Sequence, residues 1–235
     1  MWEYIVGIDT GFFLWLNSFH NPFWDEFMMI ATGKYVWIGL YVSILFSIWK
    51  SSGWKTALTV GILCGLAVTI ADQASASLIR PLVERQRPSH PDNPISDLVH
   101  IVRGYRSGGH GFPSCHAANT CAVATFLSFY FKKIRFIVTI FVWVLINCYS
   151  RVYLGVHYPG DLMVGLLIGF FTGLLCYWLL GLIFKNFKRI RDNRIFFQKE
   201  TNRGTITICD IDMIIAVEIV TLIVIFFRSI YLYTQ

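Results

Sequence analysis

Long apolar runs are the feature that most constrains this chain. Six stretches with few charged residues fall at about 27–48, 57–79, 117–132, 134–149, 162–184 and 211–232. An apolar helix of about 20 residues crosses the ~30 Å hydrocarbon core of a bilayer, and helical backbone satisfies its own hydrogen bonds there. The runs at 117–132 and 134–149 are short, so flanking residues or neighbouring helices have to complete those crossings. We therefore predict an all-α bundle of six transmembrane helices.

The composition of the 235 residues agrees with a membrane protein, because only 14% are charged and 55% are hydrophobic, whereas soluble domains carry about 25% charged residues. No repeat or linker divides the chain, which predicts a single integral membrane domain over residues 1–235. Residues 1–26 lack a basic start and a small-residue cleavage site, and they mix aromatic with acidic side chains. This pattern favours an N-terminal interfacial helix over a signal peptide.

Basic residues are concentrated in three connections between the apolar runs. The segment Lys185–Arg203 contains seven of them, and the other two connections contain Lys50 and Lys55, and Lys132, Lys133 and Arg135. Lysine and arginine favour cytoplasmic loops, so these connections are predicted to be cytoplasmic and the 80–116 and 150–160 loops to lie on the outer side. This topology accounts for most of the formal charge of +6. We therefore predict no nucleic-acid partner.

Six cysteines are present, but none belongs to a C-x-x-C pair, and Cys64, Cys148 and Cys176 lie inside apolar runs. We expect small buried hydrophobic side chains rather than disulfides.

Arginines, histidines and one aspartate gather in three short motifs at the ends of the apolar runs. They read R-x6-R-P from Arg80 to Pro88, P-S-C-H over 113–116, and S-R-x5-H-x3-D over 150–161. Arginine presents a planar fork of donors that matches phosphate oxygens and keeps its charge at any working pH. Hydrolysis of a phosphate ester also requires a nucleophile and an acid for the leaving group. The motifs therefore indicate a phosphate-handling site on the outer side of the bundle.

The three motifs, in this order, resemble those of the type 2 phosphatidic acid phosphatase (PAP2) family, whose catalytic core is similar to that of vanadium haloperoxidases. The resemblance covers roughly residues 57–184 and leaves 211–232 as a last transmembrane helix outside the core. It implies a membrane lipid phosphatase in which His157 attacks phosphorus to form a phosphohistidine. The resemblance also implies that Asp161 orients His157 for this attack, and that His116 protonates the leaving alkoxide and later activates water.

The same resemblance assigns phosphate binding to Arg80, Arg87, Ser114, Cys115 and Arg151. Backbone N–H groups at the start of the third run add donors if a helix begins there. The alternative for Ser114 is a simple helix N-cap, a role compatible with phosphate binding. The sequence departs from the family pattern at Arg80, where lysine is usual, and at Cys115, where glycine is usual. No short-spaced metal-ligand motif is present, so we expect neither a metal nor another cofactor.

The run at 104–119 is similar to the branch of this family that removes the 4′-phosphate of lipid A. Undecaprenyl diphosphate, phosphatidylglycerol phosphate and phosphatidic acid are the alternative substrates. This reading predicts a multi-pass protein of the bacterial inner membrane with its site facing the periplasm, and the lipid bilayer and a phosphorylated lipid as partners. Loss of lipid A phosphate would weaken the binding of cationic peptides to the cell surface. The sequence does not define an oligomeric state.

Three further questions stay open at this level. The segment Ser89–Gly111 is either a mobile lid or a disordered connector. Arg85, Arg103 and Arg106 either bind phosphate or make structural contacts. A non-enzymatic transporter or lipid-binding scaffold is the alternative class, but such a protein would carry charges within several spans, and the main ones here are Lys34, Asp72 and Glu218.

Overall fold

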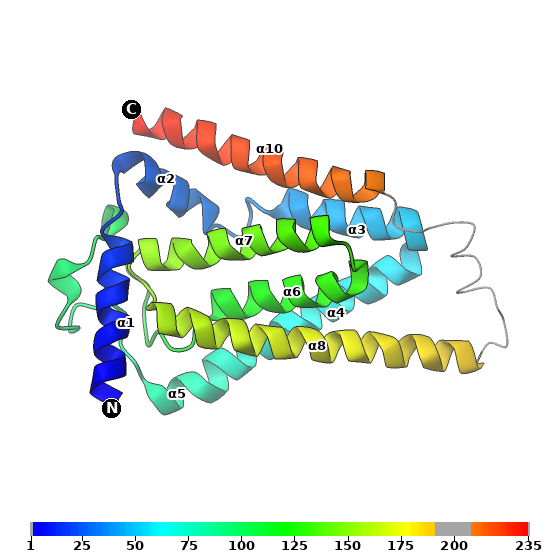
Figure 1. Ribbon diagram of the computed structural model, residues 1–235, viewed down its shortest axis with the longest axis horizontal. Coiled ribbons are helices and arrows are strands. Elements are labelled where there is room, and N and C mark those ends of the chain that lie inside the picture. Colours follow the sequence, from blue (N-terminus) through cyan, green and yellow to red (C-terminus); the bar gives the residue numbers. More distant parts are fainter. Residues whose placement is uncertain (1, 191–207, 235) are drawn as a thin grey trace.

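The computed structural model describes residues 2–190 and 208–234, and Figure 1 shows a bundle of helices running roughly side by side. Within these ranges no strand occurs, and the one extended pairing is an isolated bridge between Gln86 and His110. This confirms the all-α class. The helices, in chain order, are α1 (Trp2–Asn17), α2 (Pro22–Ala31), α3 (Ile38–Ser52), α4 (Trp54–Gln73), the π-helix η1 (Ala74–Ile79), α5 (Arg80–Val83), the short 3₁₀-helices η2 (Ser96–Leu98) and η3 (Val102–Gly104), α6 (Cys115–Phe131), α7 (Ile134–Tyr153), α8 (Pro159–Ile190) and α10 (Ile208–Tyr233).

Four helical segments of the described residues are long and apolar enough to cross a membrane. They are Trp54–Val83, Ile134–Tyr153, Pro159–Lys185 and Asp210–Tyr233, and they correspond to the predicted runs at 57–79, 134–149, 162–184 and 211–232. Large apolar side chains are exposed along their outer faces, as expected for helices in contact with lipid. The chain is therefore a multi-pass membrane protein.

The prediction of one continuous helix over 27–48 is wrong. Helix α2 ends at Ala31 and α3 begins at Ile38, with a non-helical turn over residues 32–37. The buried indole of Trp37 donates a hydrogen bond to the carbonyl of Ala31 at 2.8 Å, which satisfies one of the carbonyls left free at the end of α2. The pattern of apolar residues does not predict a tertiary side-chain contact of this kind.

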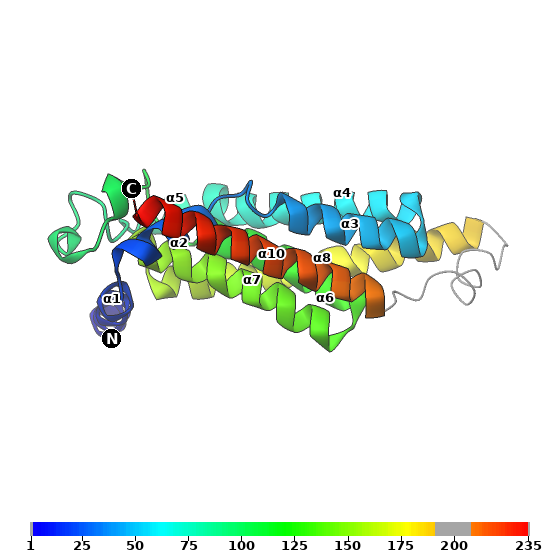
Figure 2. The ribbon, with the colours of Figure 1, turned by 90° about the horizontal axis from the view of Figure 1, so that it is seen from above.

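The segment 2–26 likewise forms more than one helix. Helix α1 ends at Asn17, and α2 starts at Pro22. The side chain of Asn21 caps α2 by accepting a hydrogen bond from the N–H of Trp24 at 2.9 Å, and proline is favoured at the first position of a helix. Helix α1 crosses one end of the bundle, roughly perpendicular to the long helices (Figures 1 and 2).

Helices α6 and α8 pack very closely because α8 carries three glycines spaced four residues apart, Gly165, Gly169 and Gly173. A Cβ atom at Gly165, Gly169 or Gly173 would lie only 2.5, 2.3 or 2.6 Å from the carbonyl oxygens of Ser114, Ala118 and Ala122, respectively. Small residues allow helix backbones in a membrane to approach in this way. The packing fixes the start of α6 beside the start of α8, where two of the three motifs lie.

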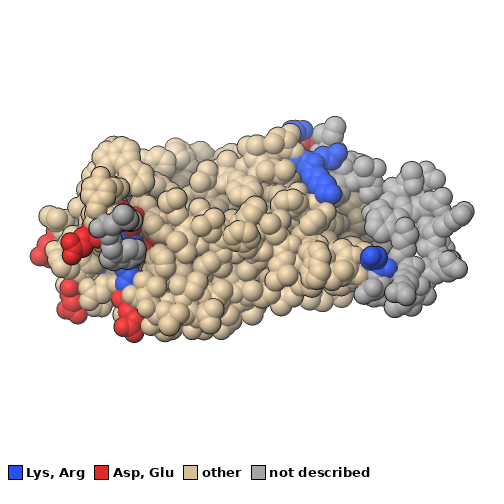
Figure 3. Space-filling model, turned by 60° about the horizontal axis from the view of Figure 1, so that its bottom comes forward, with Lys and Arg blue, Asp and Glu red and all other residues tan. Residues whose placement is uncertain are grey.

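The connections of the bundle divide between its two ends. The α3–α4 and α6–α7 connections, which contain Lys50, Lys55 and Lys132–Arg135, lie at one end, and the loops that carry the motifs lie at the other, beside α1 (Figure 1). The view in Figure 3 shows charged side chains at both ends and none across the middle of that face. The predicted cytoplasmic segment Lys185–Arg203 lies largely outside the described residues.

The described cysteine side chains are all free thiols. Cys121, Cys148 and Cys176 are buried, whereas Cys64 and Cys115 are partly exposed. The sixth cysteine, Cys209, has a side chain outside the described part.

Candidate active site

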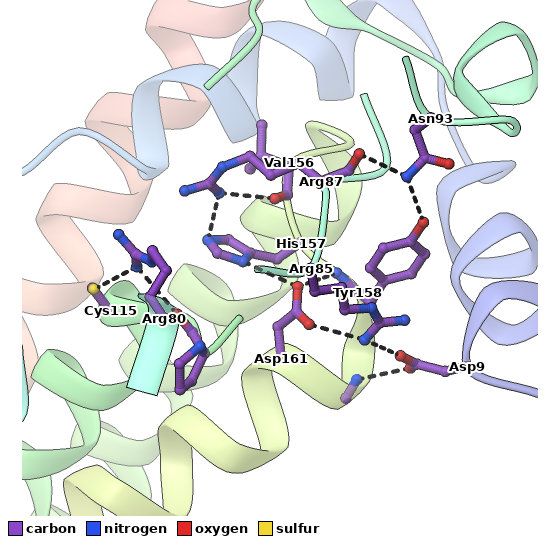
Figure 4. A network of polar contacts seen from close by, with 12 residues as sticks. Asp9, Arg80, Arg85, Arg87, Asn93, Cys115, Val156, His157, Tyr158 and Asp161 are labelled. Carbon is purple, nitrogen blue, oxygen red and sulfur yellow. Dashed lines mark hydrogen bonds and ion pairs between the residues drawn. The ribbon is translucent and has the colours of Figure 1, made fainter. Parts of the chain in front are cut away.

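The three motifs meet at the end of the bundle that α1 crosses (Figure 4). Arg80 opens α5 and Arg87 follows it in a loop, while Ser114, Cys115 and His116 stand at the start of α6. The third motif is split between the last turn of α7, with Arg151, the following loop, with His157, and the first turn of α8, with Asp161. Residues as far apart in the sequence as Arg80 and Asp161 thus form one cluster.

His157 and Asp161 form a buried pair in the centre of this cluster. The side chains are 2% and 0% exposed, and Nδ1 of His157 lies 3.3 Å from Oδ2 of Asp161. On the other side of the ring, Nη1 of Arg87 donates to Nε2 of His157 at 2.9 Å. Because arginine has no acceptor, Nε2 must accept and therefore carries no proton. The proton is on Nδ1, where it is donated to Asp161, and Nε2 holds the free electron pair.

Electrostatics favour the same neutral state of His157. Burial lowers the pKa of His157 well below its usual value, and the nearby charges of Arg87, Arg151 and Arg80 lower it further. Burial also lowers the pKa of Arg87 to about 10, with Arg80 and Arg151 adding to the effect. Arg87 still keeps its charge at neutral pH. The site therefore combines three cations with a neutral imidazole, and an anion bound there would relieve the repulsion among the cations.

Arg80 contacts the second motif directly. Its Nη2 lies 3.2 Å from the carbonyl oxygen of Pro113 and 2.8 Å from Sγ of Cys115. The two residues that depart from the family pattern are therefore in contact with each other.

Ser114 links the second and third motifs through its backbone. Its N–H donates to the carbonyl of Asp161 at 3.0 Å. The hydroxyl is fully buried, has no hydrogen-bond partner and does not cap α6. The reading of Ser114 as a simple side-chain cap is thus wrong. Nε of Arg80 and Nε of Arg151 are also buried without a partner, so the cluster holds three polar groups available to an anion.

Arg151 and His116 border the site on the side of α2 and α3. Nη1 of Arg151 donates to the hydroxyl of Thr32 at 2.8 Å, and Nη2 lies 3.5 Å from the hydroxyl of Tyr105. His116 is exposed and lines a cavity of about 550 Å³ between α3, α4, α6 and α7. Asp72 on α4 accepts a hydrogen bond from Asn119, three residues after His116, at 3.2 Å, so this carboxylate bonds to a neighbouring helix.

The sequence left the role of Arg85 open and did not single out Asp9. Nη1 of Arg85 lies 3.0 Å from Oδ1 of Asp161 and 2.7 Å from Oδ2 of Asp9, and its guanidinium stacks over the Tyr158 ring at 3.8 Å (Figure 4). Asp9 also accepts a hydrogen bond from the N–H of Gly160 at 2.8 Å. Arg85 therefore compensates the charge of the buried Asp161, and α1 is held against the site. Nothing in the pattern around Asp9 predicts this contact.

The segment 89–111 packs on the same end of the bundle. Nδ2 of Asn93 donates to the carbonyl of Arg87 at 2.9 Å and to the hydroxyl of Tyr158 at 3.0 Å. Arg106 donates to the carbonyl of Ser89, and Arg103 pairs with Glu26 of α2. The contacts of Arg103 and Arg106 are thus structural. Within the described residues, no group of three or more His, Cys, Asp or Glu side chains is placed to hold a metal ion.

Comparison with known proteins agrees with this geometry. The helical membrane fold and the arginine-lined site define a lipid phosphatase. Residues 60–185 match the PAP2 superfamily, and the chain belongs to that superfamily, as the motifs predicted. It is 50% identical over 179 residues to the lipid A 4′-phosphatase of Bacteroides thetaiotaomicron, covering 76% of this chain and 80% of the relative.

Other relatives are more distant. The lipid A 4′-phosphatase of Porphyromonas gingivalis is 36% identical over 176 residues, with 74% of each chain covered. The undecaprenyl-diphosphatase BcrC of Bacillus subtilis is 30% identical over 162 residues, covering 65% of this chain and 75% of the relative. Among solved structures, Aquifex aeolicus LpxE has a TM-score of 0.51 at 24% identity and covers 71% of this chain and 93% of its own. A PAP2-type phosphatidylglycerolphosphate phosphatase from Bacillus subtilis has a TM-score of 0.53 at 23% identity, with coverage of 80% and 89%. These two structures share the fold.

Proposed function

We propose that the chain removes the 4′-phosphate of lipid A by way of a phosphohistidine on His157. The observation that carries the mechanism is the unprotonated Nε2 of His157, held by Arg87 and backed by the contact of Nδ1 with Asp161. The substrate is supported by the 50% identity to a lipid A 4′-phosphatase.

In the first step, the phosphate oxygens bind the donors of Arg80, Arg87, Arg151 and Ser114. Arg87 exchanges Nε2 of His157 for a phosphate oxygen, which frees the electron pair for attack on phosphorus. A P–N bond forms as the P–O bond to the lipid breaks. In the free protein, burial in the cavity and the nearby Arg151, His157 and Arg87 lower the pKa of His116 to about 3, so His116 takes up its proton when the phosphate anion binds beside it. His116 then gives this proton to the departing lipid oxygen, and Asp161 stabilises the positive charge that develops on His157.

In the second step, water attacks the phosphohistidine. His116, now neutral, takes a proton from the water, the P–N bond breaks, and inorganic phosphate leaves. His157 returns to the neutral state with its proton on Nδ1. The arginines supply the charge needed by the phosphoryl oxygens, so the proposal involves no metal ion or other cofactor. Cys115 contributes its backbone N–H and a thiol that contacts Arg80.

The orientation in the membrane belongs to the same proposal. The basic connections at Lys50–Lys55 and Lys132–Arg135 lie at the end of the bundle opposite to the site, and such connections favour the cytoplasm. We place the site at the periplasmic face of the bacterial inner membrane, with α1 in the outer interface and six crossings, of which α2 and α3 together make the first. Resistance to cationic peptides is the cellular consequence.

The test is phosphate release by the purified protein in detergent with EDTA. Lipid A, undecaprenyl diphosphate, phosphatidylglycerol phosphate and phosphatidic acid are compared side by side, with His157→Ala as the inactive variant and Arg103→Ala as a matched control. We expect release mainly from lipid A, lost in His157→Ala. Preference for undecaprenyl diphosphate would indicate the activity named for the 30% identical relative instead. No phosphate release from any lipid would favour the transporter or scaffold alternative.

A further inference from the structure

The break in the first crossing is the least expected feature of the bundle. Residues 32–37 are non-helical, and α3 lies beyond the end of α2 along the bundle, with α2 tilted relative to it (Figure 1). Non-helical backbone at membrane depth is tolerated only where protein buries it or where it lines a cavity. Here the turn lines a cavity through Thr32, Lys34 and Trp37, and it is held by the hydrogen bonds from Trp37 to Ala31 and from Arg151 to Thr32.

The turn forms one wall of the 550 Å³ cavity that also contains His116. The rest of the cavity runs between α3, α4, α6 and α7, and its walls are mostly apolar side chains, among them Ile44, Leu45, Val68, Val123 and Leu127. A volume of this size is typical of a site for a small molecule or part of a lipid. Polar side chains also line the cavity, and two of them connect it to the catalytic site: His116, and Thr32, which accepts a hydrogen bond from Arg151.

Lys34 is the charged residue that the turn adds to this cavity. Its side chain is exposed, and its ammonium lies 5.1 Å from the centre of the Tyr35 ring. Within residues 2–190 and 208–234, no carboxylate pairs with it. An ionisable side chain between two apolar helices is costly and is usually retained for function, and broken helices of membrane proteins commonly build substrate sites.

We propose that this cavity binds an acyl chain of the lipid that leaves after dephosphorylation, and that Lys34 binds the carbonyl oxygen that joins this chain to the headgroup. The inference rests on the proposed function and adds a second recognition site to it. His116 borders the cavity and protonates the leaving oxygen, so the leaving lipid lies on this side of the phosphate. Lys34 and the apolar walls then select acylated over chain-free phosphate esters.

Gly65 provides the sharpest test of the apolar walls. It lines the cavity, and a Cβ added there meets nothing within 4 Å, so the side chain in Gly65→Leu would enter the space proposed for the chain. Gly181→Leu is the matched control, since a Cβ at Gly181 also meets nothing but lies outside the lining. The substrates are lipid A and glucosamine 4-phosphate, which carries a similar ester without acyl chains.

We expect Gly65→Leu to lower the ratio of kcat/KM for lipid A to that for glucosamine 4-phosphate at least tenfold, mainly through a higher KM for lipid A. Gly181→Leu should keep the wild-type ratio. The dephosphorylated lipid should also inhibit Gly65→Leu more weakly than the wild type, whereas inhibition by inorganic phosphate should be the same in both. An unchanged ratio in a folded Gly65→Leu protein overturns the inference.

Lys34→Met tests the polar end, with Lys55→Met as its control, because Lys55 also lies over a neighbouring aromatic ring, that of Trp54, at 5.6 Å. We expect Lys34→Met to raise the KM for lipid A by about tenfold or more, the effect of losing a hydrogen bond from a charged donor, and Lys55→Met to leave it unchanged. Equal behaviour of the two variants rejects the role of Lys34. If the wild-type protein hydrolyses neither substrate in a His157-dependent way, the proposed function itself fails, and the inference fails with it.

Discussion

The guanidinium of Arg80 lies 2.8 Å from the sulfur of Cys115. Each residue differs from the one usual in the family, lysine at the first position and glycine at the second, and the contact couples the two differences. The thiol occupies space that glycine would leave open beside the phosphate site, and the long arginine side chain meets it there. The pair therefore forms a local variant of the phosphate-binding site.

A double-mutant cycle at these positions should show coupling. We expect Cys115→Gly to remain active, because the phosphate contact at this position is made by the backbone, and Arg80→Lys alone to lose more activity. The double variant should be more active than the product of the two single effects predicts, by about 1 kcal/mol, as is common for residues in contact. The measurement is kcat/KM for all four proteins. If the effects of the two single substitutions on the free energy of activation simply add in the double variant, the contact does not contribute to activity.

The charge balance around Asp161 gives a second prediction. Arg85 pairs with Asp161, which is 0% exposed, and with Asp9 of α1. Arg85→Ala leaves the buried carboxylate uncompensated, which typically costs about 3–5 kcal/mol of stability, and it should lower kcat because Asp161 no longer holds His157 in place. Arg85→Lys should partly restore kcat.

The matched control for Arg85→Ala is Arg135→Ala, since the side chains of Arg135 and its partner Asp212 are 59% and 45% exposed. Such an exposed pair contributes little. Thermal unfolding in detergent and kcat are measured for each variant. If Arg85→Ala matches Arg135→Ala in both, the positioning role of Arg85 is wrong.

The lowered pKa of His157 predicts how stability depends on pH. In the folded protein, burial and the three arginines keep His157 unprotonated below its usual pKa, whereas the unfolded chain binds a proton there near pH 6.5. The unfolded state then holds more protons, so stability falls as the pH drops below about 6.5, by up to about 1.4 kcal/mol per pH unit for this group.

His157→Gln removes this contribution. Its melting temperature should therefore fall less steeply between about pH 6.5 and pH 5 than that of the wild type. The activity of the wild type should show no loss from protonation of His157 on going from pH 7 to 6. Parallel melting curves for the two proteins over this range would contradict the assignment of a neutral His157.

The close packing of α6 and α8 gives a prediction about stability. A Cβ at Gly169 would lie 2.3 Å from the carbonyl oxygen of Ala118, so Gly169→Ala must push the helices apart. We expect a loss of several kcal/mol, comparable to the larger costs of overpacking, with reduced activity because the starts of both helices carry site residues. Gly181→Ala meets no atom and should stabilise α8 slightly through its higher helix propensity. Similar melting temperatures for the two variants would argue against this account.

The sequence predicted the membrane-spanning helices and the site formed by the three motifs, because both depend on local runs of residues. Apolar runs of sufficient length located four membrane-spanning segments. The three motifs predicted one site, and the structure places Arg87, His157 and Asp161 in contact there. The break at residues 32–37 was missed because it depends on a hydrogen bond between Trp37 and Ala31, within a run that stays apolar. Asp9 was missed for a similar reason, since its partner Arg85 is 76 residues away and neither stands in a recognisable spacing with the other.

The most direct test of the central claim is to trap the phosphoryl group on the protein. Lipid A carrying a radioactive 4′-phosphate is mixed with the enzyme, the reaction is stopped with base within milliseconds to seconds, and the labelled peptide is identified by mass spectrometry. The account predicts an acid-labile, base-stable label on His157 that is absent from His157→Ala. Turnover of lipid A by the wild-type protein with no label on His157, or with the label on His116 instead, would contradict it.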